Sequence, residues 1–222
     1  MERGPAGQLE LLPAPAPLEP VRTRQEWRRL GRGERLARIL RAGITVFHRL
    51  GYQAATMDDV AAQLGITKAA LYTYVKSKEE LLFLIYLSAG EQFERLVEQV
   101  LADEKLSPVE KLHRLVVSHA ELIAGDPELF NVFFARVPFL PEAHRQRIRA
   151  GERRYVEGLE AILRAGIESG RFRPVPVRMA SFGLLGMLNW MARWFRPGAG
   201  LSGREVGEIF FGLISEGVLL RR

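Results

Sequence analysis

The sequence contains no cysteine among its 222 residues. Disulfide bonds, thiol catalysis and cysteine-ligated zinc are therefore excluded. Long hydrophobic runs are also lacking: the longest uncharged apolar stretch, residues 179–192, is shorter than the roughly 20 residues of a membrane-spanning helix. Near the N-terminus, Pro13, Pro15 and Pro17 interrupt the leucines that a signal peptide would need. We therefore expect a cytoplasmic protein that is not inserted in a membrane.

Patterns typical of enzymes are scarce as well. His113 and His119 are six residues apart, which places them on different sides of a helix, unlike the i, i+4 spacing of a zinc-binding helix. The acidic pairs at 58–59 and 79–80 lie at expected helix starts, where carboxylates interact favourably with the helix dipole. No phosphate-binding loop or nucleophile elbow is found. These observations predict a protein that is not an enzyme and carries no metal and no cofactor.

The composition is that of a globular protein with an anionic partner. Apolar residues make up 47% and charged residues 26%, and the formal net charge is +6. Such a charge suits nucleic acid, an acidic membrane surface or a phosphorylated ligand, and by itself it does not choose among them. A scaffold that binds anionic lipid is thus an alternative class at this point.

The periodicity of apolar residues predicts an all-α fold of about nine helices. We expect a disordered arm rich in proline and arginine over residues 1–30, a DNA-binding domain over 31–76, and a larger ligand-binding and dimerisation domain over 77–222. Residues 22–41 contain eight arginines and only two acids. They form either a solvated helix face or an arm that reaches DNA phosphates.

Residues 57–74 match a helix-turn-helix. Ala61 is small where two short helices cross, and Gly65 supplies the turn between them. Thr56 and Thr67 are placed to cap the two helices. The second helix could enter the major groove of DNA, with its N-terminal residues near base edges.

The match extends beyond these two helices. The stretch from Gly43 to Leu82 resembles the DNA-binding domain of TetR-family repressors, with the motifs Phe47…Gly51-Tyr52, Thr56, Gly65, Leu71-Tyr72-Thr-Tyr74 and Lys76-Ser-Lys-Glu79. At Val75 and Lys76 the family more often has proline or phenylalanine. The resemblance implies a dimeric repressor that binds a palindromic operator and is released by a small-molecule effector.

The resemblance also implies which residues contact DNA. Lys78 and the helix end capped by Thr56 would bind phosphates, and core packing is an alternative role for Tyr72 and Tyr74. The implied DNA-binding set is Thr56, Thr67, Lys68, Ala69, Tyr72, Thr73, Tyr74 and Lys78.

The C-terminal half suggests an effector class. Phe130, Phe133 and Phe134 have helical spacing, which is typical of a core but also suits an apolar pocket. The run from Gly186 to Gly198 resembles members that control fatty-acid catabolism, and these commonly respond to acyl-coenzyme A. The alternative is a multidrug-responsive regulator of an efflux gene, for which acids among the pocket aromatics are expected.

Arginines between residues 136 and 154 support a coenzyme A ligand, because their forked donors suit phosphates. A solvated helix face is the alternative explanation for them. The predicted ligand-binding set is Phe130, Phe133, Phe134, Arg136, Arg153, Asn189, Trp190, Arg193 and Trp194.

The last two helices are predicted to form a homodimer. Gly183 and Gly186 permit close approach, and an apolar seam is provided by Ile209, Phe210, Leu213 and Ile214. The long helix that begins near Ser77 joins both domains, so we expect ligand binding to shift the distance between the two recognition helices.

Overall fold

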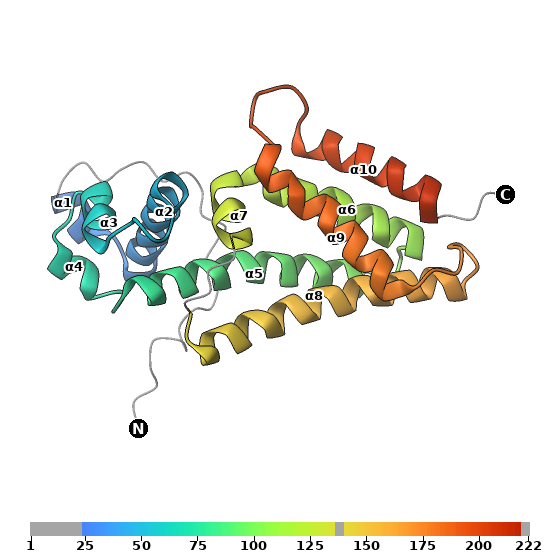
Figure 1. Ribbon diagram of the computed structural model, residues 1–222, viewed down its shortest axis with the longest axis horizontal. Helices are drawn as coiled ribbons and strands as arrows, with labels where there is room; N and C mark the ends of the chain where they lie inside the picture. Colours follow the sequence, from blue (N-terminus) through green and yellow to red (C-terminus); the bar gives the residue numbers. More distant parts are fainter. Residues whose placement is uncertain (1–23, 136–139, 219–222) are drawn as a thin grey trace. The chain divides into compact units, whose positions relative to one another are not determined.

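The computed structural model describes residues 24–135 and 140–218, and the regular elements in these ranges are all α-helices (Figure 1). Nine of the ten correspond to the predicted helices, and the first is additional. In chain order they are α1 (Arg24–Arg29), α2 (Arg32–Leu50), α3 (Met57–Leu64), α4 (Lys68–Tyr72), α5 (Lys78–Ala102), α6 (Pro108–Gly125), α7 (Pro127–Phe134), α8 (Glu142–Glu168), α9 (Val177–Trp194) and α10 (Gly203–Val218).

The described chain divides into two compact units, the first comprising residues 24–88 with Leu140 and the second residues 89–135 and 141–218. The first unit extends beyond the predicted boundary at residue 76 because the start of α5 belongs to its core. Leu81 and Ile85 are fully buried, and a Cβ atom at Gly43 of α2 would lie only 2.9 Å from Leu81 Cδ2. Helix α5 thus begins in the first unit and continues into the second.

The first unit has the predicted helix-turn-helix. Helix α3 ends at Gly65, which adopts φ +68°, a left-handed conformation that glycine reaches without a steric penalty. The N–H of the next residue, Ile66, donates to the carbonyl of Ala61 at 3.1 Å. Val60, Leu64 and Leu71 are buried and belong to the core of this unit.

Helix α1 corrects the prediction that the whole segment 1–30 is disordered. Residues 24–29 are helical, and Trp27 is only 7% exposed because it packs into the first unit. Residues 1–23 lie outside the described residues. The burial of Trp27, an apolar side chain in an arginine-rich segment, fixes the position of this short helix.

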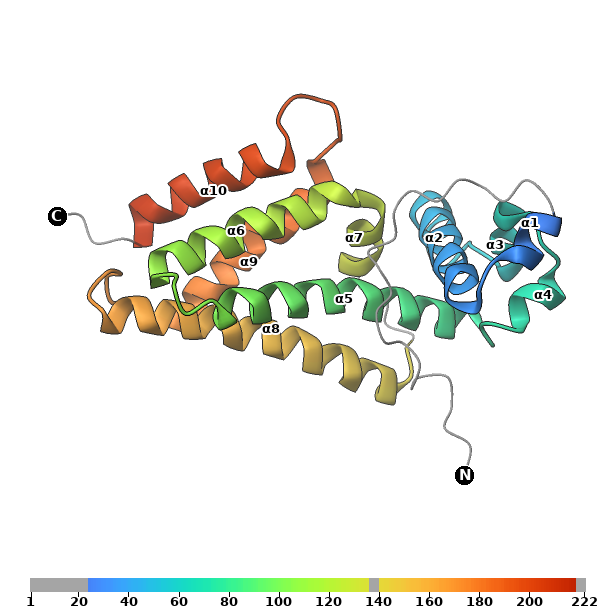
Figure 2. The ribbon, with the colours of Figure 1, turned by 180° about the vertical axis from the view of Figure 1, so that it is seen from behind.

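The second unit is built around α6, which packs against α8, α9 and α10 (Figure 2). One face of α6 supplies fully buried side chains, among them Leu112, Leu115 and Ile123. Its N-terminus is fixed by a capping box in which the Ser107 hydroxyl accepts from the N–H of Glu110. Helix α7 ends at Phe134, and residues 136–139 lie outside the described ranges.

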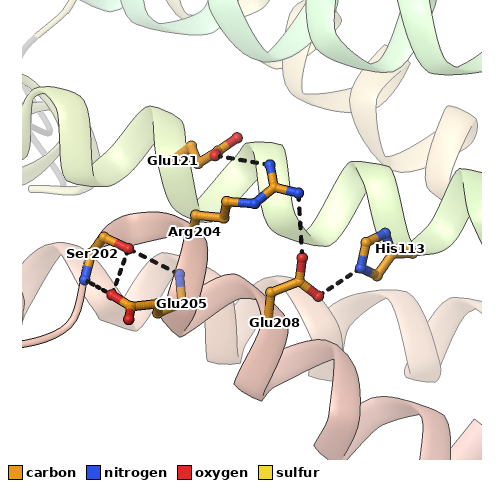
Figure 3. Close-up of polar contacts among 6 residues, drawn as sticks. All are labelled: His113, Glu121, Ser202, Arg204, Glu205 and Glu208. Atoms are coloured by element: carbon orange, nitrogen blue, oxygen red, sulfur yellow. Dashed lines mark hydrogen bonds and ion pairs between the residues drawn. The ribbon is translucent and has the colours of Figure 1, made fainter.

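Helix α10 approaches α6 closely because two glycines face it. A Cβ atom at Gly207 would lie 2.7 Å from Val117 Cα, and one at Gly203 would lie 2.3 Å from Ala124 Cβ. A polar network covers the same helix pair (Figure 3): Glu208 accepts from His113 Nε2 at 2.7 Å, and Arg204 lies 3.6 Å from both Glu208 and Glu121. Ser202 and Glu205 form a capping box at the start of α10.

Within residues 24–135 and 140–218, no helix combines the length and the apolar character that crossing a bilayer requires.

Candidate DNA-binding surface and effector site

The start of α3 is fixed by a reciprocal cap. Thr56 N–H and Thr56 Oγ1 both donate to the carboxylate of Asp59, at 2.8 and 2.6 Å, and the N–H of Asp59 donates to Thr56 Oγ1 at 3.2 Å. These hydrogen bonds lower the pKa of Asp59. The Thr56 hydroxyl proton is therefore committed to Asp59, and this residue orients the end of α3.

Helix α4 has only five residues, and side chains at both ends hold it. Thr67 Oγ1 accepts from the N–H of Ala70 at 3.2 Å, and Thr73 Oγ1 donates to the Ala70 carbonyl at 2.7 Å. Leu71 is the buried anchor of the helix. Most of the predicted DNA-binding set is brought together as exposed side chains on α4 and its two flanking residues, namely Thr67, Lys68, Ala69, Tyr72 and Thr73.

The positive charge of Lys68 has an acidic neighbour on α3. Lys68 Nζ lies 2.9 Å from Asp58 Oδ2, and this hydrogen bond raises the pKa of Lys68. Both side chains are more than half exposed. Such an exposed pair is weak in water, so the ammonium group is able to exchange Asp58 for a phosphate.

Tyr74 differs from the other members of the predicted set. Its hydroxyl accepts from Arg35 Nη1 at 2.8 Å, and its ring meets the edge of Trp27 with centroids 6.1 Å apart. The side chain is only partly exposed. Of the two roles considered for this tyrosine, the structure gives it packing, because ring and hydroxyl both contact the first unit.

Lys78 forms its hydrogen bonds within the first unit. Its ammonium group donates to the carbonyls of Tyr52 and Ala55, both at 2.8 Å, and of Gln53 at 3.3 Å, and it lies 4.5 Å from the centroid of the Tyr52 ring. An ammonium group has three N–H donors, and all three are used here. In this structure Lys78 therefore ties α5 to the segment after α2, and the phosphate contact that the resemblance assigned to it stays a prediction.

The second unit contains an aromatic cluster centred on Phe93 of α5. The Phe93 ring lies with its centroid 5.1 Å from Phe130, 6.0 Å from Phe133 and 6.3 Å from Phe134. The three α7 rings also contact one another. The predicted phenylalanines are thus brought together, and α5 supplies a central ring that sequence reasoning missed.

A buried polar network adjoins this cluster. His119 of α6, only 1% exposed, lies between Tyr155 of α8 and Asn189 of α9: the Tyr155 hydroxyl is 2.8 Å from Nδ1, and Asn189 Oδ1 is 3.1 Å from Nε2. The amide oxygen can only accept, so Nε2 carries the proton and Nδ1 accepts from Tyr155. Burial lowers the pKa of His119 to about 3 and raises that of Tyr155. The imidazole is therefore neutral near pH 7.

The polar network and the aromatic cluster are in direct contact, because the ring centroids of His119 and Phe93 are 4.6 Å apart. No local signal in the sequence indicated this network, because Tyr155 and Asn189 lie 36 and 70 residues from His119 along the chain. Asn189 is the one member of the network that belongs to the predicted ligand-binding set.

The two tryptophans and most arginines of the predicted ligand set lie elsewhere. Trp190 is 61% exposed with Arg193 over its ring, and Trp194 is also exposed, with its ring 6.4 Å from Phe210 of α10. The predicted ligand residues of α9 therefore point in two directions, with Asn189 turned toward His119 and both indoles turned outward. Arg153 is exposed, and Arg136 lies outside the described residues.

Several other arginines of α8 are paired with acids. Arg154 binds Glu94 of α5, and Arg145 and Arg149 both bind Glu142. These three arginines therefore form a solvated helix face, which was the alternative explanation for them. In the described ranges, no group of three or more histidine or acidic side chains is arranged to hold a metal ion.

Helices α9 and α10 leave large apolar side chains exposed on the single chain. Leu213 is 62% exposed, and Met179, Phe182, Trp190 and Ile209 are each about half exposed or more. A Cβ atom at Gly183 or Gly186 would meet nothing within 4 Å. Ile214, in contrast, is buried toward the rest of the unit, so only part of the predicted seam faces outward.

Two family models match the chain. The model of bacterial regulatory proteins of the TetR family matches residues 39–85, and that of the tetracyclin repressor-like C-terminal domain matches residues 105–218. The fatty acid metabolism regulator protein of Bacillus subtilis is 30% identical over 153 residues, which cover 68% of this chain and 78% of that protein.

Solved structures agree with these matches. The TetR-family regulator PfmR of Thermus thermophilus is 37% identical with a TM-score of 0.76, covering 83% of this chain and all of that one. AibR in complex with isovaleryl coenzyme A and operator DNA is 27% identical with a TM-score of 0.73, covering 80% of this chain and 96% of that one. With its helix-turn-helix, its second helical unit and matches along most of its length, the chain belongs to the TetR family of transcriptional regulators.

Proposed function

We propose that this regulator represses transcription as a dimer on a palindromic operator, and that an acyl-coenzyme A thioester bound in the second unit releases it. Two named relatives support this effector class. One is a regulator of fatty acid metabolism, and the other is seen with isovaleryl coenzyme A and operator DNA.

The observation that carries the proposal is the neutral network of His119, Tyr155 and Asn189 beside the phenylalanine cluster. Pockets for small ligands are mostly apolar and contain a few polar groups that fix orientation. Aromatic rings suit an acyl chain, and hydroxyl or amide groups can hydrogen-bond a thioester carbonyl. A neutral imidazole offers no counter-charge, which favours an uncharged acyl group over a lipophilic cation.

Phe130, Phe133, Phe134 and Asn189 are the residues we propose to contact the acyl group. Arg153, exposed on α8, is proposed to contact a coenzyme A phosphate, because a guanidinium group binds phosphate oxygens in a forked geometry.

Helix α5 provides a route for coupling. It begins in the first unit and carries Phe93 of the aromatic cluster in the second, so a ligand that displaces Phe93 acts on a helix shared with the DNA-binding unit. Two recognition helices placed in successive major grooves about 34–36 Å apart tolerate little change in spacing. A coupling free energy of about 1–3 kcal/mol would weaken operator binding by about 5- to 150-fold.

The test is a titration of a labelled duplex, first selected by the protein from random-sequence DNA, with acyl-coenzyme A thioesters of increasing chain length. At least one thioester is expected to weaken binding within that range, and free coenzyme A serves as the control. If no thioester weakens binding while a lipophilic cation such as a rhodamine dye does, the multidrug alternative replaces the acyl-coenzyme A effector.

The same titration is repeated with Asn189→Ala. This variant removes one hydrogen bond of the buried network, and we expect the thioester to release it from DNA only at higher concentration, while operator binding without thioester stays unchanged. Thioesters that are also hydrolysed would indicate an enzyme instead of a sensor.

A further inference from the structure

A tryptophan stands in the most basic part of the chain and is buried there. Trp27 belongs to α1, in a segment that is otherwise dominated by arginine. Its side chain is 7% exposed, which removes most of a large apolar surface from water. A six-residue helix has little stability of its own, so this burial fixes the position of α1.

The position of α1 is fixed by contacts with the end of α4, the second helix of the helix-turn-helix. The Trp27 ring meets the edge of Tyr74, which lies two residues after the end of α4. Arg35 of α2 completes the arrangement, because its Nε donates to the Trp27 carbonyl at 2.9 Å and its Nη1 donates to the Tyr74 hydroxyl at 2.8 Å. One guanidinium group thus binds both α1 and Tyr74, and Figures 1 and 2 both draw α1 near α4.

Two arginines close in sequence to Trp27 have exposed side chains. Arg29, two residues after Trp27, and Arg32, at the first position of α2, are both exposed. Neither forms an ion pair with an acid of the described ranges, whereas Arg38 is paired with Glu34 at 3.3 Å. Two positive side chains are therefore exposed on the segment that Trp27 and Arg35 join to Tyr74, just after α4.

We propose that α1 and the start of α2 form a second DNA contact, in which Arg29 and Arg32 bind backbone phosphates flanking the bases reached by α4. Backbone phosphates are the proposed ligands because the contacts among Trp27, Tyr74 and Arg35 hold α1 near α4. The two arginines therefore approach DNA whenever α4 does. Such contacts position a protein on the duplex and strengthen binding without reading sequence. Tyr74 and Arg35 act as positioning residues. The inference depends on DNA binding by this family and not on the identity of the effector.

The experiment measures binding to the selected duplex as a function of salt for three proteins besides the wild type. The double variant R29Q/R32Q removes both charges from an exposed surface. W27A keeps every charge but removes the side chain that fixes α1. R171Q/R173Q, which removes two exposed arginines of the second unit, is the matched control for net charge.

The slope of log K against log salt is expected to fall by about 0.9 for each lost phosphate contact in R29Q/R32Q, and by up to about 3.6 if both arginines act in both subunits. W27A is expected to lose part of the same slope, and R171Q/R173Q to keep the wild-type value. The proposal is overturned if R29Q/R32Q keeps the wild-type slope and affinity, if W27A binds like the wild type, or if the control loses as much as R29Q/R32Q. Failure of the wild type to select any duplex would instead refute the repressor function itself.

Discussion

At the scale of single residues, two polar side chains hold positions that their sequence context did not indicate. Lys78 resembles a phosphate ligand of the family by its place in the motif, yet its three donors are used by backbone carbonyls of residues 52, 53 and 55. A charged donor that satisfies several carbonyls stabilises the local fold, and removing it leaves those acceptors without their partner.

We therefore expect Lys78→Gln to reduce the free energy of unfolding by about 1–3 kcal/mol, measured by urea denaturation, with no change in the salt dependence of DNA binding. Lys76→Gln, at an exposed neighbouring position, is the control and should leave stability within about 0.5 kcal/mol of the wild type. A fall of about 0.9 in the salt slope for each subunit in Lys78→Gln, without loss of stability, would instead support the phosphate contact.

His119 is the second such residue, and its burial makes stability depend on pH. Its pKa is lowered to about 3 in the folded protein, below the ordinary value of 6.5, so between these values the unfolded chain binds more protons than the folded one. The free energy of unfolding therefore decreases as the pH falls from about 6.5 toward 3, by about 1 kcal/mol per pH unit from this residue.

The variant His119→Gln has no proton to bind in this range. We expect it to be less stable than the wild type at pH 7, because it loses packing and hydrogen bonds, and we expect the difference to shrink as the pH is lowered to 4. Urea denaturation at pH 7, 5.5 and 4 measures this, with His48→Gln at an exposed position as the control. A difference that stays constant with pH contradicts the burial of a neutral imidazole.

At the scale of elements, short helices depend on caps and close crossings more than on their own propensity. Helix α4 has five residues, too few to be stable alone, and it is held by Thr67, Thr73 and buried Leu71. The crossing of α10 on α6 depends on Gly203 and Gly207, which let the two backbones approach closely.

Gly207→Ala tests this crossing. The added Cβ would meet Val117 Cα at 2.7 Å, a backbone atom that cannot move aside, so we expect a loss of about 1–3 kcal/mol in the free energy of unfolding. Gly90→Ala in α5, where no heavy atom lies within 4 Å of the added group, should instead be neutral or stabilising by up to about 1 kcal/mol. Equal effects at the two sites would show that the crossing does not depend on glycine.

At the scale of the whole molecule, the exposed faces of α9 and α10 suggest how two chains would associate. Several large apolar side chains are about half exposed or more there on the single chain, and contiguous exposed apolar surface marks an interface in a soluble protein. A two-fold dimer through these helices would cover the surface and present two recognition helices to a palindromic operator.

We expect the wild type to have the mass of a dimer in light scattering, and Leu213→Glu to shift it toward a monomer with its helical circular dichroism retained. Leu50→Glu, which changes an exposed leucine of the first unit in the same way, should remain a dimer. A Leu213→Glu protein that is still fully dimeric would place the dimer interface elsewhere.

Much of the DNA-binding unit could be predicted from the sequence because its signals are local. Thr56 with Asp59, Gly65 and Thr67 act on backbone groups within a few residues, so their positions along the chain fix the ends of α3 and α4. The exposure of Thr67, Lys68, Ala69, Tyr72 and Thr73 follows from the same helical period, with Leu71 turned inward. The helical character of the second unit could also be predicted, from periodicity and capping boxes.

The tertiary structure alone decided which distant residues meet. Trp27 packs against Tyr74, Lys78 binds the carbonyls after α2, and His119 lies between Tyr155 and Asn189, although no local pattern links these residues. It also separated Asn189, turned inward, from Trp190 and Trp194, turned outward. Except for α1, the sequence by itself determined where the helices begin and end to within a few residues, because capping and periodicity act over short stretches of chain. The partner of each buried polar or aromatic group is chosen by packing between helices, which sequence spacing does not encode.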